Sequence, residues 1–369
     1  MEIIDRKIMV SMAILMMLAL SSELVSCKVV QFIFGDSLSD VGNNNRLTRS
    51  LARANLPWYG IDFGKGLPNG RYCNGRTVAD IIGDKTDLPR PPAYLDDSLS
   101  EDVIMENGVN FASGGGGILN DTGSLFVQRF CFYKQIELFQ GTQELIQSKI
   151  GKEAADKFFR ESRYVVALGS NDFINNFLLP IYKDSWKYSD TGFINHLMST
   201  LENQLKLLHR LGARQLIVFG LGPMGCIPLQ RILSSSGDCQ DRTNKLALGF
   251  NKAASKLMDN LSKTLPNANY KFGDAYDVVA KVIDNPHQYG FNNSDSPCCS
   301  FGQIRPALTC IPVSTLCEDR SKYVFWDEYH PSDKANEIIA DEIIRKLGFL
   351  RPNPTNAPSP APADAPSSD

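Results

Sequence analysis

Five short apolar runs, separated by stretches with helical periodicity, constrain the fold of this chain most strongly. Each run ends in glycine or leads into a polar cluster, as buried parallel strands do; the runs cover 29–35, 108–112, 164–169, 215–220 and 270–273. Helices are predicted near 134–147, 191–211, 241–264 and 332–347, where apolar residues recur at helical spacing. Strands that alternate with helices predict an α/β fold, a three-layer α/β/α domain around a central, mostly parallel five-stranded sheet of the flavodoxin-like type. Functional sites are expected at the carboxyl ends of its strands.

The two ends of the chain differ in composition from this middle part. Arg6 and Lys7 precede an apolar run at 8–20, and small residues follow up to Cys27. This order matches a secretory signal peptide, and the run is too short to span a bilayer comfortably; an uncleaved anchor is the alternative. Residues 351–369 are rich in Pro, Ala and Ser, which cannot build a core. We therefore predict a signal peptide at 1–27, one domain at 28–350 and a disordered tail at 351–369 that offers a cell-wall contact.

The cysteines and glycosylation sequons agree with a secreted, extracellular protein. Nine cysteines become eight without Cys27, and an even number in a secreted chain predicts structural disulfides. Proximity favours a Cys226–Cys239 bridge and bridges within the cluster at 298–317. Zinc is the alternative for that cluster, but Cys298 and Cys299 are adjacent and no histidine is interleaved. N-glycosylation is predicted at the sequons of Asn120, Asn260 and Asn292.

Two other kinds of partner are disfavoured. The net charge is −3 and no Lys/Arg run occurs, so neither nucleic acid nor an anionic membrane surface is indicated, and no membrane span is expected. Gly220, Gly222 and Gly225 match the dinucleotide-binding pattern G-x-G-x-x-G. However, Pro223 and Pro228 interrupt the segment that would form the phosphate-facing helix. No cofactor and no metal are therefore predicted.

A serine directly after the first apolar run is the first candidate for chemistry. The run ends in Phe-Gly, and an aspartate, Ser37 and Leu-Ser-Asp follow it. A hydroxyl at the end of a strand can be exposed to a substrate while nearby backbone amides receive an oxyanion. The alternative is an ordinary helix cap or turn.

Loops after the later strands supply residues that would complete a serine-based site. His330 follows Asp327 by three residues, so a short loop can orient the imidazole with the carboxylate and leave its other nitrogen for Ser37. The alternative for Asp327 is a turn cap. The glycine run at 114–117 can bring a backbone amide close to a ligand. Asn171 offers a side-chain amide, and its alternative is an Asx-turn.

Four blocks of the sequence, taken together, resemble a known family. They are Gly-Asp-Ser-Leu at 35–38, Gly-Val-Asn-Phe-Ala-Ser-Gly-Gly at 108–115, Gly-Ser-Asn-Asp at 169–172 and Asp-Glu-Tyr-His at 327–330. In this order they resemble the plant-type GDSL esterase/lipases of the SGNH hydrolase superfamily, over 28–350. The resemblance implies hydrolysis of lipid or other acyl esters, small or polymer-linked, through an acyl-enzyme. It further implies that Ser37 is the nucleophile, His330 the base and Asp327 its orienting partner. The implied oxyanion hole consists of the amides of Ser37 and Gly115 and the side chain of Asn171.

Two other functions remain compatible with these residues. An extracellular acyltransferase would use the same acyl-enzyme and transfer the acyl group to an alcohol in place of water. A non-catalytic, wall-associated binding protein would use the tail as its interaction element, although the intact serine, aspartate and histidine set argues against it.

Overall fold

A five-stranded parallel sheet forms the centre of the molecule. The computed structural model describes residues 29–301 and 310–348, so the predicted signal peptide and tail lie outside the described residues. The strands are β1 (Gln31–Gly35), β2 (Gly108–Asn110), β3 (Arg163–Ala167), β4 (Gln215–Phe219) and β5 (Asn269–Gly273). Their order is β2-β1-β3-β4-β5, and every neighbouring pair is parallel. The predicted flavodoxin-like sheet is confirmed, with the five strands within a few residues of their expected positions.

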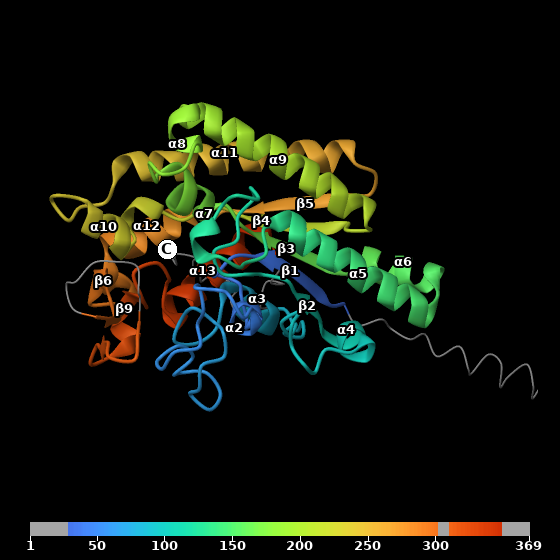
Figure 1. The fold of residues 1–369 in the computed structure, drawn as a ribbon, viewed down its shortest axis with the longest axis horizontal. Coiled ribbons are helices and arrows are strands. Elements are labelled where there is room, and N and C mark those ends of the chain that lie inside the picture. The colour runs from blue at the N-terminus through green and yellow to red at the C-terminus, as the bar shows by residue number, and fades with distance from the viewer. Residues whose placement is uncertain (1–28, 302–309, 349–369) are drawn as a thin grey trace, which may run out of the picture.

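Helices cover both faces of the sheet (Figure 1). They are α2 (Asn43–Arg46), α3 (Val78–Lys85), α4 (Glu101–Asn107), α5 (Phe132–Ile150), α6 (Lys152–Glu161), α7 (Ser170–Asp172), α8 (Asp184–Lys187), α9 (Asp190–Arg210), α10 (Pro228–Leu233), α11 (Asp241–Thr264), α12 (Tyr276–Asp284) and α13 (Asp333–Leu347). The four predicted helices correspond to α5, α9, α11 and α13. The boundary of α13 follows from Ser332, whose side chain accepts a hydrogen bond from the Ala335 amide as an N-cap.

Alternate residues of the three central strands, β1, β3 and β4, belong to two separate cores. On one face, Phe32 and Phe34 pack with aromatic and aliphatic residues of α5, α6, α9 and α11. On the other face, Ile33 packs with residues of α3 and α13. Because both faces of these three strands are covered, their central residues are apolar on both sides, and the strands appear in the sequence as continuous apolar runs rather than alternating ones.

The carboxyl end of β1 is held in place by one glutamine. Gln135 of α5 accepts from the Gly35 amide at 2.9 Å and donates to the Gly35 carbonyl at 2.8 Å. A Cβ at Gly35 would lie 2.8 Å from the Cβ of Ser39 and 3.2 Å from the Ala167 carbonyl oxygen, so only glycine fits there. The turn that carries Ser37 therefore starts from a rigid point.

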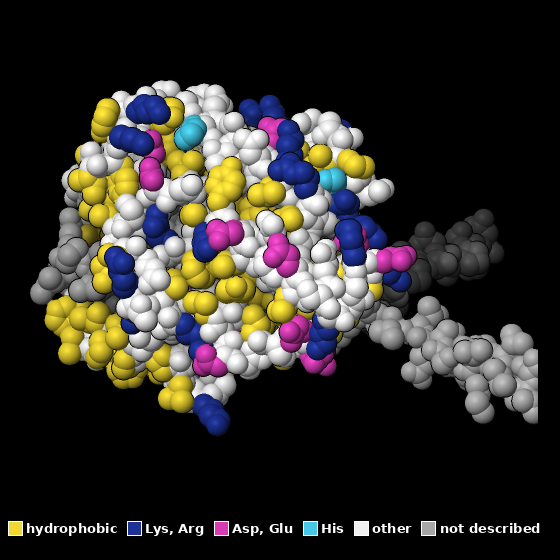
Figure 2. Space-filling model, turned by 45° about the vertical axis from the view of Figure 1, so that its right-hand side comes forward, with side chains coloured by type: hydrophobic (Ala, Val, Ile, Leu, Met, Phe, Trp, Pro, Cys, Tyr) yellow, Lys and Arg dark blue, Asp and Glu magenta, His cyan; other side chains and the backbone are white. Residues whose placement is uncertain are grey.

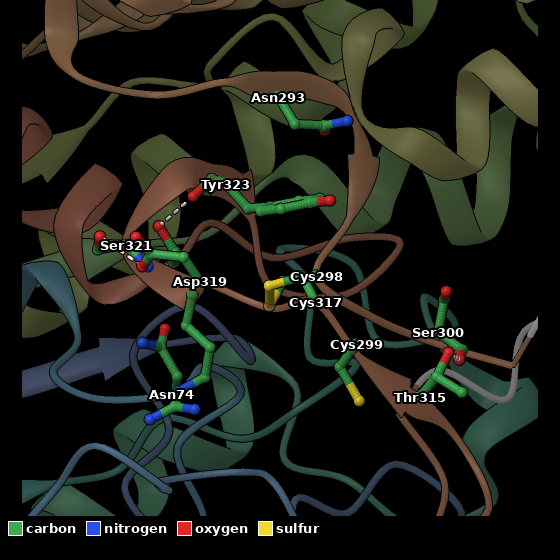
Figure 3. The surroundings of a disulfide bond; sticks show 12 residues. Asn74, Asn293, Cys298, Cys299, Ser300, Thr315, Cys317, Asp319, Ser321 and Tyr323 are labelled. Carbon is green, nitrogen blue, oxygen red and sulfur yellow. Dashed lines mark hydrogen bonds between the residues drawn. A yellow bond between two sulfur atoms is a disulfide. The ribbon is translucent and has the colours of Figure 1, made fainter.

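Two small sheets and two disulfides build the region that precedes His330, and a third disulfide closes a loop after β4. Strand β6 (Asn293–Pro297) pairs in parallel with β9 (Tyr323–Phe325), and β7 (Cys299–Ser300) pairs antiparallel with β8 (Thr315–Leu316). The bridges are Cys226–Cys239, Cys298–Cys317 and Cys299–Cys310, which confirms the pairing and the cluster expected from proximity. Figure 3 shows the Cys298–Cys317 bond, with the sulfur of Cys299 directed away from it.

The expectation that all eight cysteines pair is wrong for two of them. Cys73 and Cys131 are free thiols in the structure. Cys73 is buried, and its Sγ donates to the Arg76 carbonyl at 3.4 Å, while Cys131 directs its Sγ to Asn120 Oδ1 at 3.2 Å. Each thiol has a polar partner of its own, and the two are held in different parts of the fold.

Among the described residues, no helix is both long and apolar enough to cross a membrane. On the face of the molecule in Figure 2, Lys and Arg side chains lie beside Asp and Glu side chains. The absence of a nucleic-acid partner stays a prediction.

Candidate active site

The structure brings Ser37, His330 and Asp327 together in one hydrogen-bonded chain. Ser37 Oγ lies 2.8 Å from His330 Nε2, and His330 Nδ1 lies 2.8 Å from each carboxylate oxygen of Asp327. Ser37 comes from the turn after β1 and His330 from the loop after β9. These two loops are almost 300 residues apart in sequence and meet at the carboxyl end of the sheet.

The loop from Trp326 to His330 is shaped by local hydrogen bonds. Trp326 is fully buried, and its amide donates to the His330 carbonyl at 2.7 Å, which closes the loop. Asp327 Oδ1 accepts from the amides of Tyr329 and His330, both at 2.8 Å. The spacing of three residues therefore allows one carboxylate to bind the backbone and the ring of His330 at the same time.

Tyr59 gives Asp327 a further partner that sequence reasoning missed. Its hydroxyl donates to Asp327 Oδ2 at 2.8 Å, and both residues are buried. Asp327 thus receives hydrogen bonds from the imidazole, two amides and a phenol, so the oxygens of this buried carboxyl group have partners. The ring of Tyr72 lies 5.2 Å from that of His330 and fixes its other side.

The glycine run is held to the Ser37 turn by residues that follow the serine. Asp40 Oδ2 accepts from the Gly114 amide at 3.1 Å, and Asn44 Nδ2 donates to the Gly114 carbonyl at 2.8 Å. Asp40 also accepts from the amides of residues 42–44, and burial raises the pKa of its carboxyl to about 6. Both backbone groups of Gly114 are therefore occupied, and the next amide in the run belongs to Gly115.

The amides of Ser37 and Gly115 are available to a ligand. In the described ranges, neither backbone N–H donates a hydrogen bond to another residue. Gly115 has φ +77°, and a Cβ there would lie 2.4 Å from the ring of Phe126. The conformation and the close approach both require glycine at this position.

The side chain of Asn171 lies beside the same turn, with Asp36 as its neighbour. Asn171 Nδ2 is 3.3 Å from Asp36 Oδ2 and 3.0 Å from the Gly116 carbonyl oxygen. Asn175 Nδ2 donates to Asn171 Oδ1 at 2.7 Å, which fixes the orientation of the amide. Asp36 also accepts from Ser170 Oγ at 2.9 Å. Burial raises the pKa of Asp36 to about 6, although the hydrogen bonds from the Leu38 amide and from Ser170 lower it.

Two supporting aspartates, Asp36 and Asp40, and one supporting tyrosine, Tyr59, were therefore not recognised in the sequence. Asp36 and Asp40 lie within the same block as Ser37, so their spacing was a usable signal for side chains that bind nearby amides. Tyr59 had no such signal, because it lies in a loop 268 residues before Asp327.

The other predicted sites lie away from this chain of residues. Asn120, Asn260 and Asn292 are exposed, as glycan acceptors must be, and none lines the cavity that opens at Ser37. Within the part of the chain that the structure describes, no group of three His, Cys, Asp or Glu residues could hold a metal ion.

Comparison with known proteins identifies similar sequences along most of the chain. The family model described as GDSL-like Lipase/Acylhydrolase matches residues 32–343. A GDSL esterase/lipase of Arabidopsis thaliana is 69% identical over 345 residues, covering 93% of this chain and 94% of the relative. A second one from the same plant is 46% identical over 334 residues, covering 90% and 92%. A crystal structure described as a putative GDSL-like lipase from Parabacteroides merdae has 13% identity and a TM-score of 0.41, over 88% of this chain and 97% of the other.

Proposed function

The chain belongs to the GDSL-like lipase/acylhydrolase family, and on that premise we propose that this ester-bond hydrolase is a secreted serine esterase that acts through an acyl-enzyme. The plant members of the family include its esterase/lipase relatives. The observation that carries the proposal is the unbroken contact from Ser37 Oγ through the His330 ring to Asp327, with 2.8 Å at each step. Secretion is supported by the leader-like sequence at 1–27 and by the three disulfides.

In the proposed reaction, Ser37 Oγ attacks the carbonyl carbon of the ester while its proton moves to His330 Nε2. The proton then passes to the departing alcohol oxygen as its bond to the acyl carbon breaks, which leaves an acyl-Ser37 ester. Water attacks this ester and gives a proton to Nε2, and the carboxylic acid leaves as the proton returns to Ser37 Oγ. Asp327 accepts a hydrogen bond from His330 Nδ1–H throughout, which keeps that proton on Nδ1. Nε2 is therefore the nitrogen that exchanges protons.

The developing oxyanion is expected to lie among the amides of Ser37 and Gly115 and the side chain of Asn171. The two amides support this assignment because no described residue accepts from them. Asn171 would exchange its 3.3 Å contact with Asp36 for a bond to the oxyanion. A long hydrogen bond is the weaker of its two, so the exchange is favoured as negative charge develops on the substrate.

Replacing Asn171 with alanine is expected to lower kcat by about 10²–10³, the usual effect of losing one oxyanion donor. KM should change little, because the donor acts on charge that develops only in the transition state. Steady-state kinetics with p-nitrophenyl acetate measures both constants, and thermal unfolding shows whether the variant is folded. An Asn171→Ala protein that is folded and keeps its kcat would exclude this side chain from the oxyanion site.

Covalent labelling tests the proposed mechanism directly. A fluorophosphonate probe should add to one residue of the native protein, and peptide mapping should place it on Ser37 rather than on the nearby Ser39 or Ser170. Incubation of the labelled and unlabelled protein with an ester and an added alcohol then identifies the acyl acceptor. Free acid as the main product supports hydrolysis, whereas a new ester as the main product would favour acyl transfer. A folded protein that is not labelled would instead favour a binding role.

A further inference from the structure

An apolar cavity of about 270 Å³ opens at Ser37 and continues far beyond the catalytic residues. We propose that it binds the acyl chain of the substrate, and that the protein therefore acts on esters of medium-length acids of about ten carbons. The inference rests on the proposed esterase function and adds the class of substrate to it.

The course of the cavity follows the carboxyl edge of the sheet. Its lining passes from Ser37 after β1 to Ala167 at the end of β3, then to Phe219 at the end of β4, and ends at Ala275 after β5. Residues of α13, including Ile339 and Ile343, and residues of α12, including Val279, line its inner part. The cavity thus runs sideways across four neighbouring strands, between their ends and the two helices.

The chemistry of the lining changes along this course. The acidic and basic lining residues are Asp36 and Arg53, which lie with His330 at or beside the catalytic end. Around β4, α12 and α13 the lining side chains are aliphatic or aromatic, apart from Asn336, whose amide donates to the Arg76 carbonyl at 2.8 Å. An alkyl chain is stabilised by such a surface, whereas a sugar or a charged group would lose its hydrogen bonds to water there.

Two glycines of the loop after β4, Gly220 and Gly222, line this cavity. Their spacing resembles that of a nucleotide-binding loop. A Cβ on Gly222 would meet only Val279 Cγ1, at 4.0 Å, and its φ is not left-handed. The missing side chain therefore leaves open space between the β4 loop and α12, where a larger residue would project into the path of the acyl chain.

The length of the cavity limits the length of the chain. Three strand spacings separate β1 from β5, which corresponds to about 14 Å. Carbon–carbon bonds of about 1.5 Å advance an extended chain by roughly 1.3 Å per carbon, so about ten carbons fit. Gly222 follows β4, only two spacings or about 10 Å from the first strand. A block at Gly222 should therefore affect decanoate and leave acetate unaffected.

The test compares p-nitrophenyl acetate and p-nitrophenyl decanoate as substrates of the full protein. Each buried methylene can raise kcat/KM by up to about fourfold, so the wild type should prefer decanoate. In Gly222→Phe, kcat/KM for decanoate should fall by roughly 50-fold, since about three methylenes lose their site, while the value for acetate changes by less than about twofold. Gly141→Phe is the matched control, because it adds the same side chain at an exposed position of α5 where a Cβ would meet nothing within 4 Å, and it should behave as the wild type.

A second pair of variants covers the case in which Gly222→Phe does not fold. Val279→Trp fills the same space from α12, and Lys281→Trp places the same residue on the exposed side of that helix. Only the first should lose decanoate activity selectively. Wild-type rates for decanoate in both filling variants would overturn the acyl site while leaving the esterase function intact. Failure of the wild type to hydrolyse any ester, together with no labelling of Ser37, would overturn the esterase function and the acyl site with it.

Discussion

Replacing Ser37 with alanine is expected to abolish ester hydrolysis, with a decrease in kcat on the order of 10⁵–10⁶. The variant has no nucleophile, and the remaining acid–base residues and oxyanion donors cannot form an acyl-enzyme. Stability should be nearly unchanged, within about 0.5 kcal/mol, because the half-buried hydroxyl makes only its contact with His330. Hydrolysis of p-nitrophenyl acetate, corrected for the rate without enzyme, and the thermal unfolding midpoint together measure both expectations.

Ser39→Ala is the matched control for this prediction. It removes a hydroxyl from the same turn, and in the described structure the Ser39 hydroxyl makes no hydrogen bond to another residue. This control should retain activity close to that of the wild type. Equal hydrolysis by wild type and Ser37→Ala would show that the reaction does not depend on a serine nucleophile at this position.

Replacing Asp327 with asparagine is expected to lower kcat by about 10³–10⁴ with little change in shape. The asparagine amide would face His330 Nδ1 with an N–H donor, so Nδ1 would become the acceptor and the ring proton would move to Nε2. That nitrogen could no longer accept the Ser37 proton, although the 2.8 Å geometry would remain. The kcat for p-nitrophenyl acetate measures the loss, and the pH–rate profile should change because the tautomer of His330 changes.

Tyr59→Phe tests the hydrogen bond to Asp327 separately from the Asp327 carboxylate itself. It removes the phenol that donates to Asp327 Oδ2 but keeps the carboxylate and both amide donors. A loss of no more than about tenfold is expected, since one hydrogen bond to a charged group contributes about 1.5–3 kcal/mol and only part of it acts on the reaction. An Asp327→Asn variant with a loss as small as this would argue that the carboxylate does not set the tautomer of His330.

The sheet was predictable because its strands are buried on both faces. Residues 31–35 and 215–219 carry little but apolar side chains and are followed by glycine or polar residues, so each strand appears directly in the sequence. The small strands β6 and β8 could not be predicted in this way. Strand β6 is polar and at most partly buried, β8 is only two residues long, and each pairs with a strand distant in sequence.

The site was predictable where its residues follow strands or stand in short motifs. Ser37 follows β1, and Asp327 lies three residues from His330, so local geometry sufficed to place them on candidate loops. The interaction of Tyr59 with Asp327 is a property of the folded chain alone. The same holds for Gly222, whose place beside Val279 depends on how the β4 loop meets α12.

The disulfide region has a consequence for how the protein reaches its active form. The amides of Cys298 and Cys299 donate to the carbonyls of Phe325 and Trp326, so the bridges of these cysteines hold the backbone immediately before Asp327. The turn that carries Ser37 is held instead by Gln135 and needs no disulfide. Reduction of the Cys298–Cys317 and Cys299–Cys310 bridges is therefore expected to loosen the loop that carries Asp327 and His330, while the turn that carries Ser37 keeps its place.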